Sequence, residues 1–133
     1  MILNIKKAFE KRLATLSPAI ATAYEGVSFT PTTAPYQRVM LVPSQPLNPT
    51  MGTEHYREVG SFHVFLNYPA NKGSGEAIAR ASQIRTLFKR GTTLIEDSTE
   101  VKILTTPQIS GNSIVQDRIV VPVIISYIAD VFE

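Results

Sequence analysis

Hydrophobic side chains recur every three or four residues near the start of the chain. The stripe consists of Ile2, Ile5, Phe9, Leu13 and Leu16. Charged residues lie between its members, so the pattern predicts an amphipathic helix over residues 1–16. Ser17 and Pro18 are expected to end this helix, because the residue before a proline avoids helical geometry. The apolar stripe requires a sheet or another partner to cover it.

A second helical stripe follows a turn at residues 69–75 that contains proline and glycine. The stripe consists of Ala77, Ala81, Ile84 and Phe88, flanked by Ile78 and Leu87. This pattern predicts a helix from Glu76 to about Lys89, which Gly91 would end. Glu76 and Arg80 lie four residues apart and are expected to form a solvated ion pair on its surface.

Alternating hydrophobic positions predict two long strands before the second helix. Residues 36–42 are rich in β-branched and apolar side chains, and Pro43 would end this strand. Residues 62–68 place Phe62, Val64, Leu66 and Tyr68 on one face and His63, Phe65 and Asn67 on the other. Because both faces have apolar content, this segment is expected to be a central strand.

Further strands are expected at residues 23–27, 93–95 and 101–105, and at 114–128 after a turn at Ser110-Gly111-Asn112. Pro122 cannot donate a ladder hydrogen bond, so the last strand is predicted to be an edge strand or to contain a bulge. The order of elements favours an α+β fold. We expect a two-layer sandwich with a mainly antiparallel sheet and two helices packed on one face.

A long projecting loop is predicted at about residues 43–57, because this segment is polar and contains three prolines after the strand. Leu47, Met51 and Tyr56 are apolar residues within it. They either fold back onto the domain or form a contact surface for a partner.

Composition indicates one globular domain spanning residues 1–133, since the chain is 44% apolar and 18% charged. Its net charge is only +2, which argues against nucleic acid as the main partner. The chain has no cysteine, so it has no disulfide framework. Charged residues interrupt the N-terminal segment, so no signal peptide is predicted. The apolar run at 119–128 is too short for a membrane helix, and no membrane partner is expected.

Candidate catalytic and ligand-binding patterns are weak. Gly73 and Gly75 precede a helix, but they match neither a dinucleotide fingerprint nor a phosphate-binding loop. His55 and His63 have too few neighbouring ligands for a zinc site. The serines lack the G-x-S-x-G motif, and the carboxylates are scattered. We therefore expect no enzyme, no metal and no cofactor, with an uncharacterised hydrolase as the weakest alternative.

The basic cluster of Arg80, Arg85, Lys89 and Arg90 lies on the second helix and just after it. One interpretation is a solvated face whose last members complement the negative end of the helix. The other is contact with an acidic patch on a partner subunit or with DNA phosphate.

Several segments together resemble the tail terminator-like proteins of long-tailed phages, which are related in role to the minor tail protein U type. The segments are R-L-A-T-L-S-P (12–18), A-Y-E-G-V-S-F-T-P (23–31), Y-Q-R-V-M-L-V-P (36–43), N-P-T-M-G (48–52), Y-R-E-V-G-S-F-H-V-F-L-N-Y-P (56–69), R-A-S-Q-I-R-T-L-F-K-R-G (80–91) and V-V-P-V (120–123). The similarity covers nearly the whole chain.

This resemblance implies a structural subunit of a ring, expected to be a hexamer, that caps the tail tube and provides the surface for joining the head. Implied partners are copies of itself, the tail tube protein and a head-completion or neck protein, with a passing contact to DNA. The implied location is the head-proximal end of the virion tail, after assembly in the host cytoplasm. The candidate interface residues are Leu47, Met51, Tyr56, Arg57, Glu58, Arg80, Arg85 and Lys89. Alternatives are another neck or head–tail connector protein, or a small nucleic-acid-binding module that uses Arg80, Arg85 and Lys89.

Overall fold

The computed structural model describes residues 2–17, 19–31, 34–70, 73–111, 113–115 and 117–132. Pro18 and Asn112, which the sequence placed at a helix end and in a turn, lie outside these residues. The elements are α1 (Ile2–Ala14), β1 (Ala21–Ala23), β2 (Tyr36–Pro43), β3 (His55–Pro69), α2 (Gly75–Leu87), β4 (Thr93–Glu96), β5 (Thr99–Lys102), β6 (Gln108–Ile109), β7 (Ser113–Val115) and β8 (Arg118–Phe132). No helix in the described part of the chain is long and apolar enough to cross a membrane.

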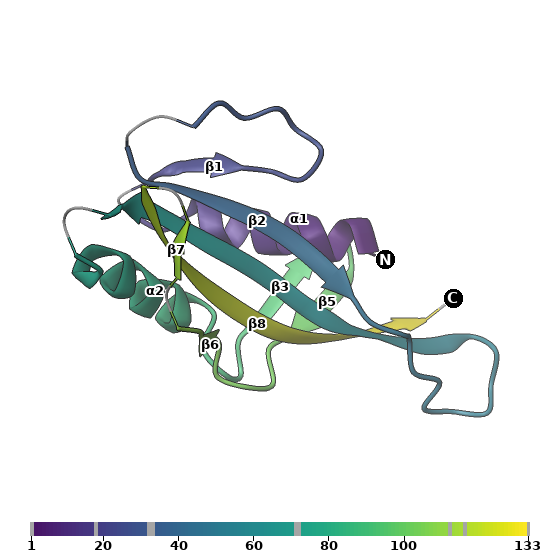
Figure 1. Ribbon diagram of the computed structural model, residues 1–133. Helices are drawn as coiled ribbons and strands as arrows, with labels where there is room; N and C mark the ends of the chain where they lie inside the picture. The colour runs from purple at the N-terminus through teal and green to yellow at the C-terminus, as the bar shows by residue number, and fades with distance from the viewer. Residues whose placement is uncertain are drawn as a thin grey trace.

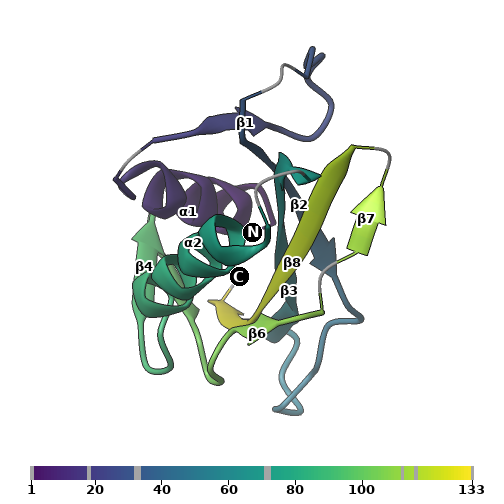
Figure 2. The same ribbon diagram turned by 60° about the vertical axis from the view of Figure 1, so that its left-hand side comes forward.

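One sheet contains all the strands, in the order β1-β2-β3-β8-β5-β4, with β6 and β7 also paired to β8. The pair β1–β2 is parallel, whereas the other pairs are antiparallel. Figure 1 shows β2, β3 and β8 as long neighbouring strands, and Figure 2 shows both helices on the same side of them. The predicted α+β class is confirmed. The sheet is mainly antiparallel, as predicted, but the simple two-layer sandwich is corrected, because the parallel β1–β2 pair makes the sheet mixed and the sheet curls around the helices (Figure 2).

The core lies between the two helices and the sheet. Phe9 on α1 is fully buried and stacks on Phe62 of β3, with ring centroids 4.7 Å apart. Phe88 and Tyr127 also contact the Phe9 ring, each at a centroid distance of 5.6 Å. The helical stripes predicted from the sequence supply this core: the buried positions are Ile5, Ala8, Phe9 and Leu13 on α1, and Ala77, Ala81 and Ile84 on α2.

The strand β8 is central, so the predicted edge position of the strand that carries Pro122 is wrong. It pairs with β3 along its whole length, from His55↔Phe132 to Pro69↔Arg118. The Pro122 carbonyl accepts a hydrogen bond from the Ser110 N–H at 3.0 Å, on the side of β6 and β7. Because the N–H and C=O of a strand residue point to the same side, the missing donor of Pro122 faces these short strands. The long β3–β8 ladder therefore loses no bond.

Candidate assembly surfaces

The sheet has one face that neither helix covers. Side chains alternate along β3, with Phe62, Val64 and Leu66 toward the helices and His63 and Phe65 toward the open face. The expected division of this strand into two faces is confirmed. Neighbouring strands extend the open face in rows, since Met40 pairs with His63 and His63 pairs with Ile124.

The open face is partly apolar. Met40 and Val42 are each 38% exposed, and Phe65, Ile124 and Ile128 are partly buried. His63 lies among them, and desolvation by burial lowers the pKa of its imidazole. One of its ring nitrogens, Nε2, lies 2.8 Å from the Ser61 hydroxyl. A neutral histidine in an apolar row suits a surface that is covered by a partner.

The second surface is an arm formed by residues 44–54, between β2 and β3. The Ser44 N–H donates to the Val59 carbonyl at 2.8 Å, and Leu47 and Arg57 exchange two backbone hydrogen bonds. These bonds make the base of the arm a continuation of the β2–β3 hairpin. Figure 1 shows the arm extending beyond the sheet near the C-terminus. The predicted loop at 43–57 is therefore shorter, and Tyr56, Arg57 and Glu58 belong to β3.

A fixed polar cluster lies on the open face of the sheet, at the base of the arm. The Asp130 carboxylate accepts a hydrogen bond from Arg57 Nε at 2.8 Å and lies 2.9 Å from His55 Nε2. The hydrogen bond from Arg57, followed by that from His55, lowers the pKa of Asp130. The Phe132 ring stacks on the His55 ring with centroids 4.5 Å apart. These contacts hold the last residues of β8 against β3.

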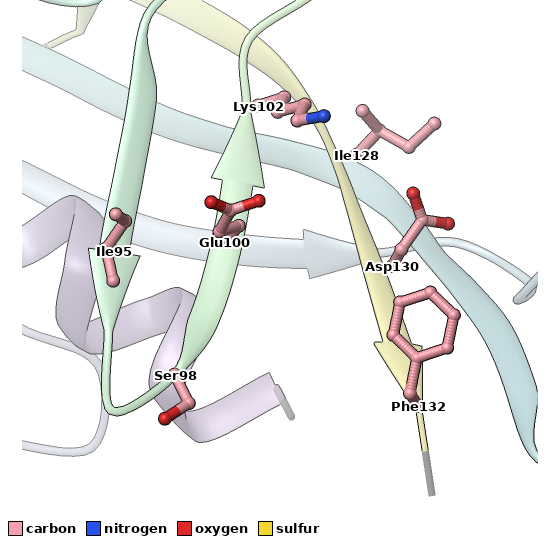
Figure 3. Close-up of a pocket in the computed structure, with 7 residues that line it drawn as sticks. All are labelled: Ile95, Ser98, Glu100, Lys102, Ile128, Asp130 and Phe132. Carbon is pink, nitrogen blue, oxygen red and sulfur yellow. The ribbon is translucent and has the colours of Figure 1, made fainter.

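A slot separates the end of β8 from the β4–β5 hairpin (Figure 3). We call it the β5–β8 slot. Its opening on the open face has a volume of about 480 Å³ and is lined by Ile95, Ser98, Glu100, Lys102, Ile128, Asp130 and Phe132. A second opening of about 500 Å³, on the side of α1, is lined by Asn4, Asp97, Ser98, Thr99, Asp130, Val131 and Phe132. Ser98, Asp130 and Phe132 line both, so the two cavities adjoin each other at the end of β8.

Two of the predicted interface residues are buried. Glu58 is 6% exposed and lies near Tyr127, whose pKa rises to about 12 because of burial and the nearby Glu58 carboxylate. Arg80 is 4% exposed, so the solvated position expected for it on the surface of the helix is wrong. Burial lowers the pKa of Arg80, and the neighbouring Tyr68 partly offsets this effect.

Tyr56 lies on β3, and the other five predicted interface residues form two groups, one on the arm and at its base and one on the helix side of the sheet. Leu47 and Met51 lie on the arm, with Arg57 at its base on the open face. Arg85 and Lys89 are exposed on the helix side, where Arg85 Nε donates to the Pro107 carbonyl at 3.0 Å. Sequence reasoning did not find Asp130, Phe132 or the slot.

The arrangement has features of a binding surface and few of a catalytic one. No group of three or more side chains that could hold a metal ion gathers among the described residues. The Asp130 carboxylate already contacts the Arg57 guanidinium and the His55 imidazole, which is a cation when protonated. What the geometry offers is a half-apolar sheet face, an exposed arm and a slot between strands.

Comparisons with known proteins identify the family. One solved structure, whose name states no function, superimposes with a TM-score of 0.78, covers 97% of this chain and 95% of its own, and is 24% identical in sequence. This likeness concerns the fold alone. No curated protein sequence matches the chain. The sequence model of the family described as phage tail terminator protein matches residues 4–127. The chain therefore belongs to the phage tail terminator protein family and is a structural component of the virion tail.

Proposed function

We propose that this chain is the subunit of a closed ring, a hexamer, at the head-proximal end of the tail. The ring binds the end of the finished tail tube, stops its growth and offers its other side to a head-completion or neck protein. The subunit acts by binding, without turnover, and the ring assembles in the host cytoplasm. The family match over residues 4–127 is the observation that carries this proposal.

The geometry supports the proposal because a ring subunit needs two different, complementary surfaces. Head-to-tail contacts join unlike patches and close at the right rotation between subunits. The exposed arm and the β5–β8 slot, which opens on the open sheet face, are unlike patches of this kind. We propose Leu47, Met51, Arg57, Arg85 and Lys89 as direct contact residues. Tyr56, Glu58 and Arg80 would position the strand and helix that carry them.

A passing contact with DNA is a further part of the proposal. Basic residues are concentrated in the helical part of the chain. Eight of the thirteen basic residues, but only two of the eleven acidic residues, lie within residues 2–14 and 75–91, the segments that contain the two helices. Arg12 Nη2 donates to the Leu87 carbonyl at 3.3 Å, which brings the basic ends of α1 and α2 together. The small net charge of the whole chain conceals this separation of charge. Because the helix layer has an excess of basic residues, it would attract DNA phosphate groups more strongly than the sheet would.

Native mass spectrometry of the purified protein, together with averaged electron micrographs of tail ends, tests the ring. We expect six copies in a closed ring at the end of the tube that receives the head, either preassembled in solution or formed on the tube. A ring at the opposite end, or a single copy on each tail, would contradict the proposal. A ring found between the head and a separate terminator would instead assign the chain to another neck role.

A further inference from the structure

The β5–β8 slot exposes two strand edges that have no partner. The strand β5 joins β8 only through the pair Lys102↔Ile128. Beyond this pair the strands diverge, as Figure 3 shows, and Thr99–Val101 and Ala129–Phe132 are unpaired on their facing edges within the described part of the chain. Unpaired edges readily accept an extended segment, because its backbone completes their hydrogen bonds.

The walls of the slot are partly apolar and are held in place. Ile95 is 68% exposed and Phe132 is 76% exposed, although both line the same opening. The His55 ring supports the Phe132 ring from behind, and Arg57 and His55 fix Asp130. A preformed site of this kind binds a segment with less loss of conformational freedom than a mobile site does.

The arm has the properties of a segment that would fill such a slot. Every residue from 44 to 54 is exposed, and the Met51 side chain near its tip is completely so, at 104%. Leu47 is 50% exposed. The tip from Thr50 to Glu54 contains no proline, so it can donate backbone hydrogen bonds.

We propose that the arm of one copy occupies the β5–β8 slot of the next copy, and that this exchange closes the ring. This inference rests on the proposed ring. Met51 would pack against Ile95 and Phe132, since a thioether contacts aromatic rings favourably and adapts to irregular gaps. The arm carries Glu54, and the slot carries Lys102, whose side-chain ammonium group forms no ion pair or hydrogen bond with another described residue.

A second copy is a better occupant than the chain's own arm. The arm ends next to His55, against which the slot residue Phe132 is stacked, and Figure 1 shows the arm extending beyond the sheet. The arm and the slot are also different surfaces of one chain, so joining them repeats head to tail around a ring. In this arrangement each subunit gives one arm and receives one.

Cysteine cross-linking tests the exchange directly, because the chain contains no cysteine of its own. The double variant Met51→Cys/Ile95→Cys changes two exposed side chains, so the core is undisturbed. We expect oxidation, or a short thiol cross-linker, to convert most of the monomer band into a covalent ladder that ends at the ring size. The reaction is run both on purified protein and on assembled tails.

The matched control is Met51→Cys/Ile114→Cys, since Ile114 is 74% exposed on β7, away from the slot. The control and the two single variants are expected to give no species larger than a dimer. An intact ring by native mass with no ladder from the slot pair, or a bond formed within one chain, would overturn the exchange and leave the proposed function standing. A protein that forms no ring, even on tails, would overturn both.

Discussion

Replacing Phe9 with alanine is expected to lower the free energy of unfolding by about 3–5 kcal/mol, the usual cost of truncating a fully buried phenylalanine. Phe9 is 0% exposed and is the point at which α1 meets the sheet. Its ring contacts Phe62, Phe88 and Tyr127, so truncation removes contacts to β3, β8 and the segment after α2 together. Urea denaturation followed by far-UV circular dichroism measures the change.

The matched control is Leu3→Ala on the same helix, because Leu3 is 59% exposed. Its effect is expected to remain within about 0.5 kcal/mol, as for most surface substitutions. If both variants had the same small effect, the assignment of Phe9 to the centre of the core would be wrong.

Gly60→Ala is expected to destabilise the fold by about 1–3 kcal/mol, the range for inserting a methyl group into packed surroundings. A Cβ atom at Gly60 would lie 2.5 Å from the Val42 carbonyl oxygen and 2.7 Å from the Tyr127 hydroxyl oxygen. The first of these is backbone in the neighbouring strand β2, so it cannot move without disturbing the ladder. Thermal unfolding of the purified variant measures the loss.

Gly52→Ala provides the control for Gly60→Ala, because nothing lies within 4 Å of a Cβ atom at Gly52. A near-neutral result at Gly52 and a clear loss at Gly60 would show that close packing, and not glycine flexibility, determines the effect. Equal losses at the two positions would refute the close approach of Tyr127 to β3.

Local patterns in the sequence were sufficient to predict the two helices and the faces of β3. The spacing of Ile5, Phe9 and Leu13 determines which side of α1 is buried, and no distant contact is needed to read it. The same is true of Phe62 and Val64 on β3. The spacing of hydrophobic residues within one helix or strand predicts which of its side chains are buried, and for α1 and β3 this prediction was correct.

Features that depend on pairing between distant segments could not be predicted. His55 and Arg57 are joined to Asp130, which lies 75 and 73 residues away, so the cluster depends on the β3–β8 register. Pro122 suggested an edge strand, but its missing donor faces the short strands on the far side of β8 from β3. Arg80 was expected to be exposed because it is charged and lies on a helix. Only the packing of α2 on the sheet shows that Arg80 is buried.

The most direct test of the account is the length of tails made without this protein. A phage with the coding sequence deleted is compared with the same phage complemented by the intact chain, and tail lengths are measured by electron microscopy. We predict tails of irregular and excessive length that fail to join heads in the deletion, with normal length restored by complementation. Tails of normal, uniform length that join heads in the absence of the protein would contradict the account.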